Sequence, residues 1–513
     1  MFKIFYSLLL FVHLTALSAQ PSIQWQKTLG GSLNENARSI EQTSDGGYIT
    51  AGFTVSDDGD IAENYGFFDF WVVNFDSLGA VLWKKNYGGS SFEEAFAIKQ
   101  TSDSGFIVTG YTESNDIDVS GNHGNKDVWL LKLDSIGNIQ WQKCLGGSNW
   151  DEANDIQLTI DGGFVLVGRS GSTDGDVTGN HGSWDYWVVK LSSTGQIEWQ
   201  KCYGGGNYDF GYTIFPTSDG GYIVAGEAAS TDGDIIGNPG GMAAWVIKLN
   251  FEGKIEWQKA LGGSYIDRAN DIIQTREGGY MVFGQTESND GDVSGNHGSM
   301  DLWAVKLSEL GEIEWQRAMG GNSQDGGTSI QQANDGGYIA TGIVNSNNGD
   351  VSGNHGSSDM WVVKLTEGGE IQWQKALGGT SAERGYSIKQ TNDNGYIVAG
   401  DAWSTNGDLT ENKGKTDLWI VKLAPESTPI STPATQPLNI YPNPASQAIT
   451  LQVSSQDLSL ALGITDFLGR LISQQTISNG GNVDIASLAN GLYFLTATTP
   501  SGKVFSGKFR KQE

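Results

Sequence analysis

The chain has 513 residues, of which 31 are Lys or Arg and 59 are Asp or Glu, so its formal net charge is −28 at pH 7. This excess of acid argues against nucleic acid or an anionic membrane surface as a partner, because both are bound through basic surfaces. Glycine supplies 72 residues, about twice its usual share of ~7%, which favours many tight turns over long helices.

Residues 1–19 have the pattern of a secretory signal peptide. Lys3 precedes an apolar run from Leu8 to Val12, and the small residues Ser18 and Ala19 follow. Such a segment is too short to remain as a membrane span, and no other stretch is long and apolar enough to be one. We therefore expect the mature protein to leave the cytoplasm, with no transmembrane segment.

Residues 20–423 contain seven copies of one unit with a constant step of 58 residues. The sequence IQWQKCLGG at 139–147 recurs as IQWQKTLGG at 23–31, IEWQKALGG at 255–263 and IQWQKALGG at 371–379. Two ladders of tryptophans keep this step without insertion or deletion: Trp25, Trp83, Trp141, Trp199, Trp257, Trp315 and Trp373, and Trp71, Trp129, Trp187, Trp245, Trp303, Trp361 and Trp419. A fixed period of this kind indicates repeated supersecondary units.

Each unit contains four strand signals, which in the first copy are residues 37–43, 48–52, 70–75 and 81–85. Asp45-Gly46-Gly47 between the first two strands is typical of a hairpin turn. Helical periodicity is absent. Four short strands in each of seven units predict an all-β, seven-bladed β-propeller.

The two ends of the repeat region predict how the ring closes. A single strand of the fourth type, residues 23–27, precedes the first complete unit, and the last unit, residues 382–423, lacks its fourth strand. We expect residues 23–27 to complete that last blade, which pairs the edges that an open ring would expose. The first strand of each blade then lines the axis and the fourth lies outermost. Two kinds of loop then lie on one face, which we call the upper face: the loop from the second to the third strand of a blade, and the loop from the fourth strand to the next blade.

Three tryptophans depart from the ladders. The ladder tryptophans are expected to fill the space between blades, whereas Trp150, Trp184 and Trp403 fall on or beside upper-face loops. Together with Tyr208 they are candidates for contact with an extracellular glycan or protein ligand, the alternative being simple packing of the loops.

An acidic residue begins every inner strand, where the upper end of a central channel is expected. The set is Glu35, Glu93, Asp151, Asp209, Asp267, Asp325 and Glu383. Two interpretations stay open: an acidic funnel for a cation or cationic ligand, and carboxylates that accept hydrogen bonds from neighbouring blades.

Pairs of carboxylates recur in the loop between the second and third strands. They are Asp58, Asp60, Asp116, Asp118, Asp174, Asp176, Asp232, Asp234, Asp290 and Asp292. Calcium takes roughly six to eight oxygen ligands, and these loops offer carboxylates, an amide and backbone carbonyls. Calcium is therefore the one cofactor that the pattern suggests, and the alternative is that these side chains tie down their own turns.

No residue is indicated as catalytic. An active site usually breaks the symmetry of a repeat, whereas here the ionisable residues mostly repeat with the unit, and no Ser, Cys or Lys stands beside a histidine outside the pattern. We therefore expect a non-catalytic binding or scaffold module. The alternative is a propeller-type carbohydrate-active enzyme, either a hydrolase or a lyase.

The only cysteines, Cys144 and Cys202, occupy the same position of neighbouring outer strands. Adjacent blades splay apart there, and a disulfide requires Cα atoms within roughly 7 Å of each other. We expect both thiols to be free.

The repeat stops before residue 424. Residues 424–437 carry four of the ten prolines among Ser and Thr, as in a semi-extended linker. Residues 438–513 alternate in short segments such as 448–454, which predicts a small Ig-like β-sandwich of about seven strands.

Four motifs of this tail are IYPNPA at 440–445, DFLG at 466–469, NGLYF at 490–494 and the basic end at 507–511. Together they resemble the type A C-terminal sorting domain of the type IX secretion system. The matching motif residues are Tyr441, Pro442, Asn443, Pro444, Gly491, Tyr493, Lys508 and Lys511. The resemblance implies export by the type IX machinery through the outer membrane of a Gram-negative bacterium, followed by removal of the domain at the surface. A resident Ig-like adhesion module is the alternative.

Overall fold

The computed structural model describes residues 20–426, 436–453, 459–466, 470–500 and 503–512. The chain divides after Glu426 into two compact units. The predicted signal peptide, residues 427–435 of the predicted linker and residues 467–469 of the DFLG motif lie outside the described residues. The regular secondary structure of the described residues is entirely β-strand, and they contain no helix with the length and apolarity needed to span a membrane.

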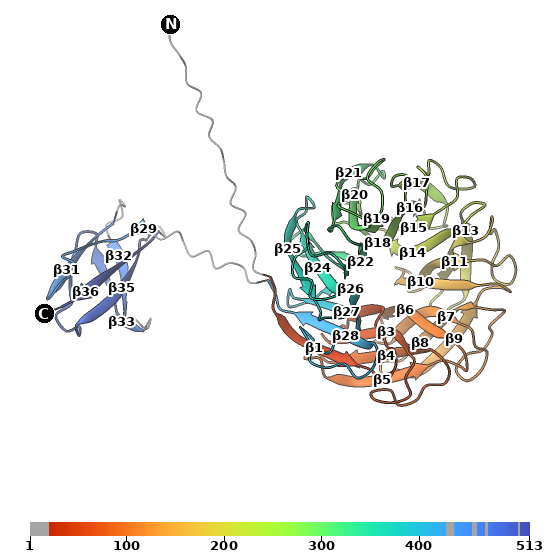
Figure 1. Ribbon diagram of the computed structural model, residues 1–513, viewed down its shortest axis with the longest axis horizontal. Coiled ribbons are helices and arrows are strands. Elements are labelled where there is room, and N and C mark those ends of the chain that lie inside the picture. Colours follow the sequence, from red (N-terminus) through yellow and green to blue (C-terminus); the bar gives the residue numbers. More distant parts are fainter. Residues whose placement is uncertain (1–19, 427–435, 454–458, 467–469, 501–502, 513) are drawn as a thin grey trace, which may run out of the picture. The chain divides into compact units, whose positions relative to one another are not determined.

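The described part of the larger unit consists of seven four-stranded antiparallel sheets, the blades, arranged around a common axis (Figure 1). Blades 1 and 2 are β2 (Ser39–Gln42), β3 (Tyr48–Thr54), β4 (Asp69–Phe75), β5 (Val81–Tyr87) and β6 (Glu93–Gln100), β7 (Phe106–Thr112), β8 (Asp127–Leu133), β9 (Ile139–Leu145). Blades 3 and 4 are β10 (Asp151–Leu158), β11 (Phe164–Ser170), β12 (Asp185–Leu191), β13 (Ile197–Tyr203) and β14 (Asp209–Pro216), β15 (Tyr222–Ala228), β16 (Ala243–Leu249), β17 (Ile255–Leu261). Blades 5 and 6 are β18 (Asp267–Gln274), β19 (Tyr280–Thr286), β20 (Asp301–Leu307), β21 (Ile313–Met319) and β22 (Asp325–Gln332), β23 (Tyr338–Val344), β24 (Asp359–Leu365), β25 (Ile371–Leu377).

Blade 7 is built from both ends of the propeller. It joins β26 (Glu383–Gln390), β27 (Tyr396–Ala402) and β28 (Asp417–Leu423) to the first strand of the chain, β1 (Ile23–Leu29). The pairing of β1 with β28 is antiparallel and places Thr28 opposite Trp419. The predicted closure is confirmed, and Figure 1 shows first strands such as β14 near the axis and fourth strands such as β17 at the periphery.

Both ladders of tryptophans fill the space between blades, as predicted. Those of the third strands are fully buried, and the Trp129 indole nitrogen donates a 3.0 Å hydrogen bond to Gln142 on the outer strand of its own blade. Those of the outer strands meet an aromatic ring of the next blade, as Trp83 meets Phe106 with ring centroids 6.0 Å apart. Edge-to-face pairs of this kind contribute about 0.5–1.5 kcal/mol each beyond their buried area.

A constant glycine lets the two inner strands of each blade approach closely. In blade 1 this residue is Gly52, and a Cβ there would lie 2.2 Å from the carbonyl oxygen of Asn36. The register shifts at the same level in the other blades, for example between Ala95 and Ala97 on β6. Such an irregularity bends the strand and increases its local twist, so it affects how the residues at the upper end of the inner strand are directed.

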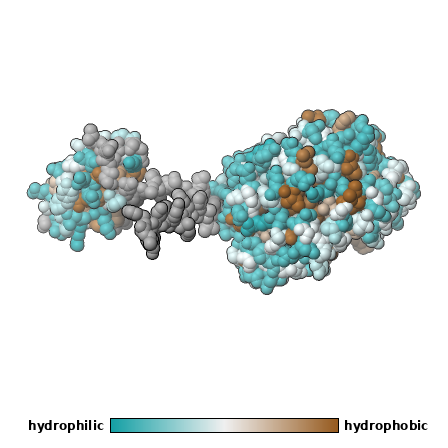
Figure 2. All heavy atoms as spheres, turned by 90° about the horizontal axis from the view of Figure 1, so that it is seen from above, coloured by the Kyte–Doolittle hydropathy of each residue, from teal (hydrophilic) through white to brown (hydrophobic). Residues whose placement is uncertain are grey.

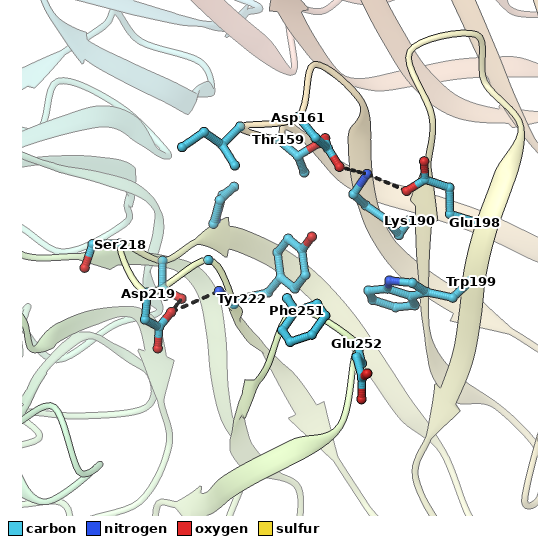
Figure 3. A pocket seen from close by; sticks show the side chains of 15 residues that line it. Thr159, Asp161, Lys190, Glu198, Trp199, Ser218, Asp219, Tyr222, Phe251 and Glu252 are labelled. Atoms are coloured by element: carbon cyan, nitrogen blue, oxygen red, sulfur yellow. Dashed lines mark hydrogen bonds and ion pairs between the residues drawn. The ribbon is translucent and has the colours of Figure 1, made fainter.

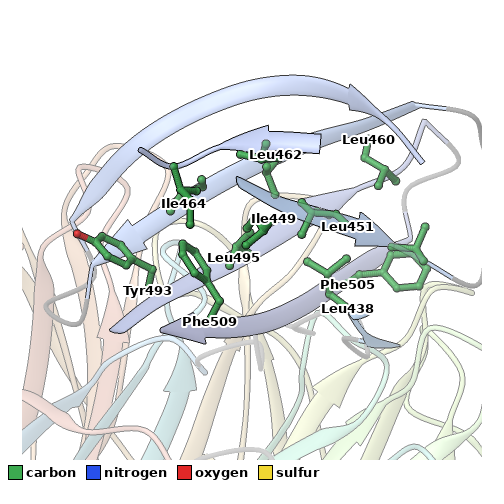
Figure 4. Packing of buried hydrophobic residues seen from close by; sticks show 14 of the residues in the cluster. Leu438, Ile449, Leu451, Leu460, Leu462, Ile464, Tyr493, Leu495, Phe505 and Phe509 are labelled. Carbon is green, nitrogen blue, oxygen red and sulfur yellow. The ribbon is translucent and has the colours of Figure 1, made fainter. Parts of the chain in front are cut away.

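The smaller unit is a two-layered β-structure. Its strands are β29 (Gln436–Pro437), β30 (Asn439–Tyr441), β31 (Ala448–Gln452), β32 (Ser459–Asp466), β33 (Leu471–Ser478), β34 (Asn482–Asp484), β35 (Gly491–Thr498) and β36 (Val504–Lys511). A five-stranded sheet, β29-β36-β35-β32-β33, and a three-stranded sheet, β30-β31-β34, share one core. Ile449 and Leu451 of the smaller sheet pack with Leu462, Leu495 and Phe509 of the larger one (Figure 4). The predicted small sandwich is confirmed, with eight strands in the described residues.

Candidate binding site at the upper rim of the propeller

The seven units differ strongly from one another at four positions of the upper face, which we call the rim positions. The first precedes the inner strand and holds Asn34, Phe92, Trp150, Tyr208, Ile266, Gln324 and Ala382, seven different residues. The second lies two residues later and holds Asn36, Glu94, Glu152, Phe210, Arg268, Gly326 and Arg384. The third, near the end of the second strand, again holds seven different residues: Phe53, Tyr111, Arg169, Glu227, Gln285, Ile343 and Asp401. The fourth, before the third strand, holds Phe68, Lys126, Trp184, Met242, Met300, Ser358 and Thr416.

The rim positions of neighbouring strands and blades lie next to each other. The second and third are cross-strand partners, as Glu152 and Arg169 are. The fourth position of one blade forms an isolated bridge with the first position of the next, as Lys126 does with Trp150 and Trp184 with Tyr208. The varied residues of the rim positions are therefore linked around the upper end of the inner strands.

Aromatic and cationic side chains form a continuous cluster over blades 2 to 4. The rings of Trp150 and Trp184 lie 6.2 Å apart, and Trp184 is 6.2 Å from Phe210. The Arg169 guanidinium lies 4.5 Å from the Phe210 ring and 5.0 Å from that of Trp184. Trp150 and Tyr208 remain about half exposed. The structure thus brings together three of the four predicted aromatic contact residues.

A second group of rings lies between blades 1 and 2. Phe53 stacks on Phe68 with centroids 4.6 Å apart, and Phe67 stacks on Phe92 at 4.9 Å. Phe67 is 61% exposed, which is unusual for a phenylalanine without a partner. The aromatic residues of the rim therefore gather over blades 1 to 4, whereas blades 5 and 6 offer mostly smaller or polar side chains such as Gln324 and Ser358.

Most cations at or beside the rim positions are held by carboxylates. Arg38 lies 2.8 Å from Glu94, Arg169 lies 2.8 Å from Glu152, and Arg268 also pairs with Glu227. These ion pairs orient the arginine side chains, and aromatic rings such as Phe210 pack against the guanidinium groups.

Of the two interpretations of the acidic residues that begin the inner strands, hydrogen-bond acceptors fit the geometry better than an acidic funnel. Glu35, Glu93, Asp151, Asp209, Asp267, Asp325 and Glu383 are all buried, with at most 1% of their surface exposed. Asp151 shows their role: its Oδ2 accepts hydrogen bonds from the Gly147 amide at 2.8 Å and the Ser172 hydroxyl at 2.7 Å. Burial raises the pKa of Asp151, and these hydrogen bonds oppose that rise. The carboxylates hold the loop that connects two blades and do not face a ligand.

The paired carboxylates of the loop between second and third strands serve the same connecting loop. Asp116 Oδ1 accepts the Ser90 amide at 2.8 Å, and Asp176 Oδ2 accepts the Gly146 amide at 3.3 Å. Among the residues that the structure describes, no group of three or more His, Cys, Asp and Glu side chains is arranged to hold a metal ion. The geometry thus supplies a role for these side chains without a metal, and calcium binding is the alternative left to experiment.

A further carboxylate begins the third strand in six of the seven blades. Asp69, Asp127, Asp185, Asp301, Asp359 and Asp417 occupy this position, with Ala243 in blade 4. Each is fully buried, and one oxygen accepts a loop amide, as Asp69 Oδ2 does from Tyr65 at 2.8 Å, while the other has no partner among the described residues. Burial, together with the nearby Glu93, raises the pKa of Asp69 to about 7.

Trp403 lies apart from the other predicted contact residues, in a cavity of about 170 Å³ where blade 7 meets blade 1. Rim residues of both blades line it, among them Asn36, Phe53, Arg384 and Asp401. The Arg384 guanidinium lies 4.5 Å from the Trp403 ring.

The opposite face carries a larger groove between blades 3 and 4, with a volume of about 870 Å³. Trp199, Tyr222 and the exposed ring of Phe251 border it, and Lys190 pairs with Asp161 and Glu198 beside them (Figure 3). In the space-filling view the surface is mostly hydrophilic, and apolar residues gather in a few patches on the larger unit (Figure 2). Sequence reasoning missed this groove, although Phe251 departs from the residues at its repeat position, which include Ser77 and Ser135.

The sorting motifs meet in the smaller unit. Asn443 Oδ1 accepts the Arg510 amide at 3.0 Å, and its Nδ2 donates to the Lys508 carbonyl at 2.9 Å. Tyr493 stacks on Phe509 with ring centroids 5.5 Å apart. Tyr441, Pro442 and Pro444 belong to the segment that Asn443 anchors, and Gly491 is the register partner of Lys511.

Residues 439–509 match the family model of the secretion system C-terminal sorting domain. The resemblance of the tail is confirmed: this region is a type IX sorting domain, which marks a chain for secretion or for the outer surface of a Gram-negative bacterium and implies interaction with the secretion machinery. Fold and tail together define the chain as a β-propeller exported by type IX secretion.

Other similarities are weaker. A region of 184 residues is 23% identical to the regulatory protein FlaEY of Caulobacter vibrioides and covers 33% of this chain and 19% of that protein. The chain thus spans about a fifth of the length of this curated relative.

Among solved structures, the extracellular domain of a putative hybrid two-component system from B. thetaiotaomicron has a TM-score of 0.40 at 10% identity, covering 96% of this chain and 60% of that one. Sqt1 from Chaetomium thermophilum has a TM-score of 0.42 at 10% identity, covering 79% and 100%. The propeller class follows from the seven sheets of this chain itself.

Proposed function

We propose that the exported propeller is a non-catalytic binding module that recognises an extracellular glycan or protein at its upper rim. The observation that carries this proposal is the concentration of differences among the units at the rim positions. A ring that served only as a spacer would not require different side chains at neighbouring, partly exposed positions of its upper face. Function resides in such a site and does not follow from the propeller fold alone.

The chemistry of the rim supports binding. Half-exposed Trp150 and Tyr208 and the exposed Phe67 offer large apolar surfaces with little rotamer entropy to lose, the properties of residues that dominate interfaces. Their neighbours Arg169 and Lys126 are held in ion pairs with Glu152, at 2.8 and 3.8 Å. The rim is thus organised before a ligand arrives, which lowers the entropic cost of binding.

The experiment is to apply the full-length mature protein to an array of immobilised glycans and to a panel of surface proteins from the same environment. Trp150→Ala and Phe67→Ala should each weaken binding at least tenfold, which corresponds to about 1.4 kcal/mol. Leu310→Ala is the matched control, because Leu310 is 79% exposed in a hairpin of the opposite face. It should leave binding within twofold.

The variant Phe251→Ala tests whether the ligand binds in the groove of the opposite face and not at the rim. Phe251 is exposed to 67%, close to the 61% of Phe67, but borders the groove on the opposite face. Loss of binding with Phe251→Ala and not with Phe67→Ala would move the site to the groove and contradict the proposal.

A further inference from the structure

The cavity between blades 7 and 1 is lined by a carboxylate, Asp401, and an arginine, Arg384, which do not form a salt bridge with each other. Asp401 is only 4% exposed; its Oδ2 accepts the Tyr386 hydroxyl at 3.0 Å, and its Oδ1 has no hydrogen-bond partner among the described residues. Buried polar atoms nearly always have a partner in a protein or in its bound ligand and water. Asp401 therefore has capacity for one more donor.

Arg384 stands beside it. The two are register partners on β26 and β27, so their side chains lie on the same face of the blade. Arg38, Arg169 and Arg268 of the neighbouring sites each pair with a glutamate, but no described carboxylate lies within ion-pair distance of Arg384. Its guanidinium lies 4.5 Å from the Trp403 ring and interacts with Tyr386 and, electrostatically, with Asp401. Its five N–H groups leave donors for a ligand.

Blade 4 provides an internal comparison. There Tyr212 donates to Glu227 at 2.7 Å, just as Tyr386 donates to Asp401, but Glu227 is also paired with Arg268. Arg268 belongs to the next blade, blade 5, and the corresponding residue beside blade 7 is Asn36 of blade 1. The arginine that closes the frame at blade 4 is therefore replaced at blade 7 by an asparagine. Trp403 is also specific to blade 7, since no other unit has an aromatic residue at its repeat position, which holds Val55, Glu113, Gly171, Ala229, Glu287 and Asn345.

The size of the cavity limits what it accepts. Its 170 Å³ equals the volume of about six water molecules at ~30 Å³ each, well below the ~300–1,000 Å³ of sites for drug-sized ligands. One six-membered ring fits this range, and the aromatic rings of Trp403 and Phe53 line the cavity beside the polar groups.

We propose that this cavity binds a single pyranose ring through two neighbouring hydroxyl groups. Each hydroxyl is both a donor and an acceptor, so one donates to Asp401 Oδ1 while the other accepts from the Arg384 guanidinium. The C–H face of the ring packs against the aromatic side chains. The inference rests on the proposed function and specifies it: the ligand is a glycan, and its terminal residue enters between blades 7 and 1.

Ligand-observed NMR with the full-length mature protein tests the inference. The probes are the methyl pyranosides of mannose, glucose, galactose and fucose, with sodium acetate and sodium sulfate as anionic alternatives. At least one pyranoside should bind, and its analogue methylated on one hydroxyl of the diol should not. Asp401→Asn and Arg384→Gln should each weaken binding tenfold or more.

The matched controls lie at the far end of the propeller. Asp393→Asn changes a carboxylate of the same blade that pairs with Lys422, and Arg276→Gln changes an arginine in the hairpin of blade 5. Both should leave the affinity within twofold. Melting temperatures of all variants show whether each is folded, and a misfolded Asp401→Asn would leave Arg384→Gln to decide.

Three results separate the two proposals. If no pyranoside binds, or if acetate or sulfate binds in its place with the same dependence on Arg384, the inference is overturned. If array binding depends on Trp150 but not on Asp401 and Arg384, the rim binds a ligand and this cavity is not its sugar site. If pyranoside binding depends on Asp401 and Arg384, while Trp150→Ala and Phe67→Ala leave binding to the array unchanged, the cavity assignment holds and the wider rim proposal fails.

Discussion

The indole nitrogen of Trp419 donates a 2.8 Å hydrogen bond to Oε1 of Gln26, although 393 residues separate the two along the chain. The same bond joins Trp129 to Gln142 at 3.0 Å and Trp303 to Gln316 at 2.9 Å, across 13 residues of one blade. One repeated contact therefore either stiffens a blade or joins the two ends of the propeller, depending only on where the outer strand comes from.

Removal of the closing strand should destabilise the whole ring. Deletion of residues 20–30 exposes the edge of β28 and removes the Trp419 bond, so we expect a loss of several kcal/mol from a typical total of about 5–15. Thermal unfolding measures it. Gln142→Leu, which breaks the equivalent bond inside blade 2, should cost only about 1 kcal/mol. An unchanged melting temperature after the deletion would contradict this role of β1.

Cys144 and Cys202 are free and buried, as predicted from their spacing. Burial raises the pKa of the Cys144 thiol to about 12, so its reactive thiolate is scarce at neutral pH. Iodoacetamide at pH 8 should leave both residues unmodified in the folded protein and alkylate both after unfolding without reductant. Recovery of a species two mass units lighter would reveal a disulfide.

The sorting domain should be dispensable for the stability of the propeller. Each unit has its own hydrophobic core, and the division falls after Glu426. A chain that ends at residue 437 should keep the melting temperature of the propeller but accumulate in the periplasm of its host. Mass spectrometry of surface-exposed protein should find C-termini within or near residues 424–437. Intact chains through Glu513 at the surface would instead indicate a resident adhesion module.

The buried carboxylate Asp69 should make the protein less stable as pH rises. Its pKa is about 7 in the folded state and near 3.9 when unfolded, so the folded state binds the proton more tightly. The stability that this proton confers is full below about pH 4 and lost as pH rises to 7. Asp69→Asn should therefore raise the free energy of unfolding by roughly 2–4 kcal/mol at pH 8.

The same substitution should have little effect at pH 4, which serves as its control. Asn can still accept the Tyr65 amide that Asp69 accepts at 2.8 Å, and blade 4 has Ala243 here without any carboxylate. Urea denaturation at both pH values provides the comparison. A loss of stability at pH 8 would show that the ionised carboxylate has a partner essential to the fold.

Chelation of calcium should leave the propeller unchanged. Asp58 Oδ1 already accepts the Ser32 amide at 2.7 Å, and Asp116 accepts the Ser90 amide at 2.8 Å, so these loops are ordered by their own hydrogen bonds. The melting temperature should be equal in millimolar EDTA and in millimolar calcium chloride. A marked rise with calcium, and not with magnesium, would establish the metal site that the sequence suggested.

The architecture of the propeller could be predicted because it depends on period and polarity. The tryptophan steps located every blade, and the missing fourth strand after Trp419 predicted the place of β1. The role of Asp151 could not be predicted in this way. The sequence pattern is the same whether a carboxylate at the start of a strand faces a channel or accepts a hydrogen bond from the Gly147 amide. Its burial depends on how the loop between blades folds over it.

The candidate site was predicted in part. Trp150 and Trp184 stood out because they break the tryptophan ladders, and they do meet on the rim. Asp401 and Arg384 did not stand out, since one charged residue near the end of a strand gives no signal of its own. Comparing each repeat position across the seven units would have found them, because the rim positions differ where the frame does not. Such differences carry information about function that the overall composition does not contain.

The joints between blades use nearly the same residues throughout: an outer-strand tryptophan such as Trp83 or Trp257 packs on a Phe or Tyr of the next blade. The rim residues are not part of these Trp–aromatic joints, although some of them, such as Arg268 and Glu227, pair across the border between two blades. A whole unit of 58 residues could therefore be exchanged for another and bring its own rim residues with it, while the joints on both sides stay intact. Recombination between repeats of the gene would then rearrange the recognition surface in a single event and preserve the ring, provided that the number of units remains seven. New specificities become accessible by shuffling existing parts as well as by point mutation.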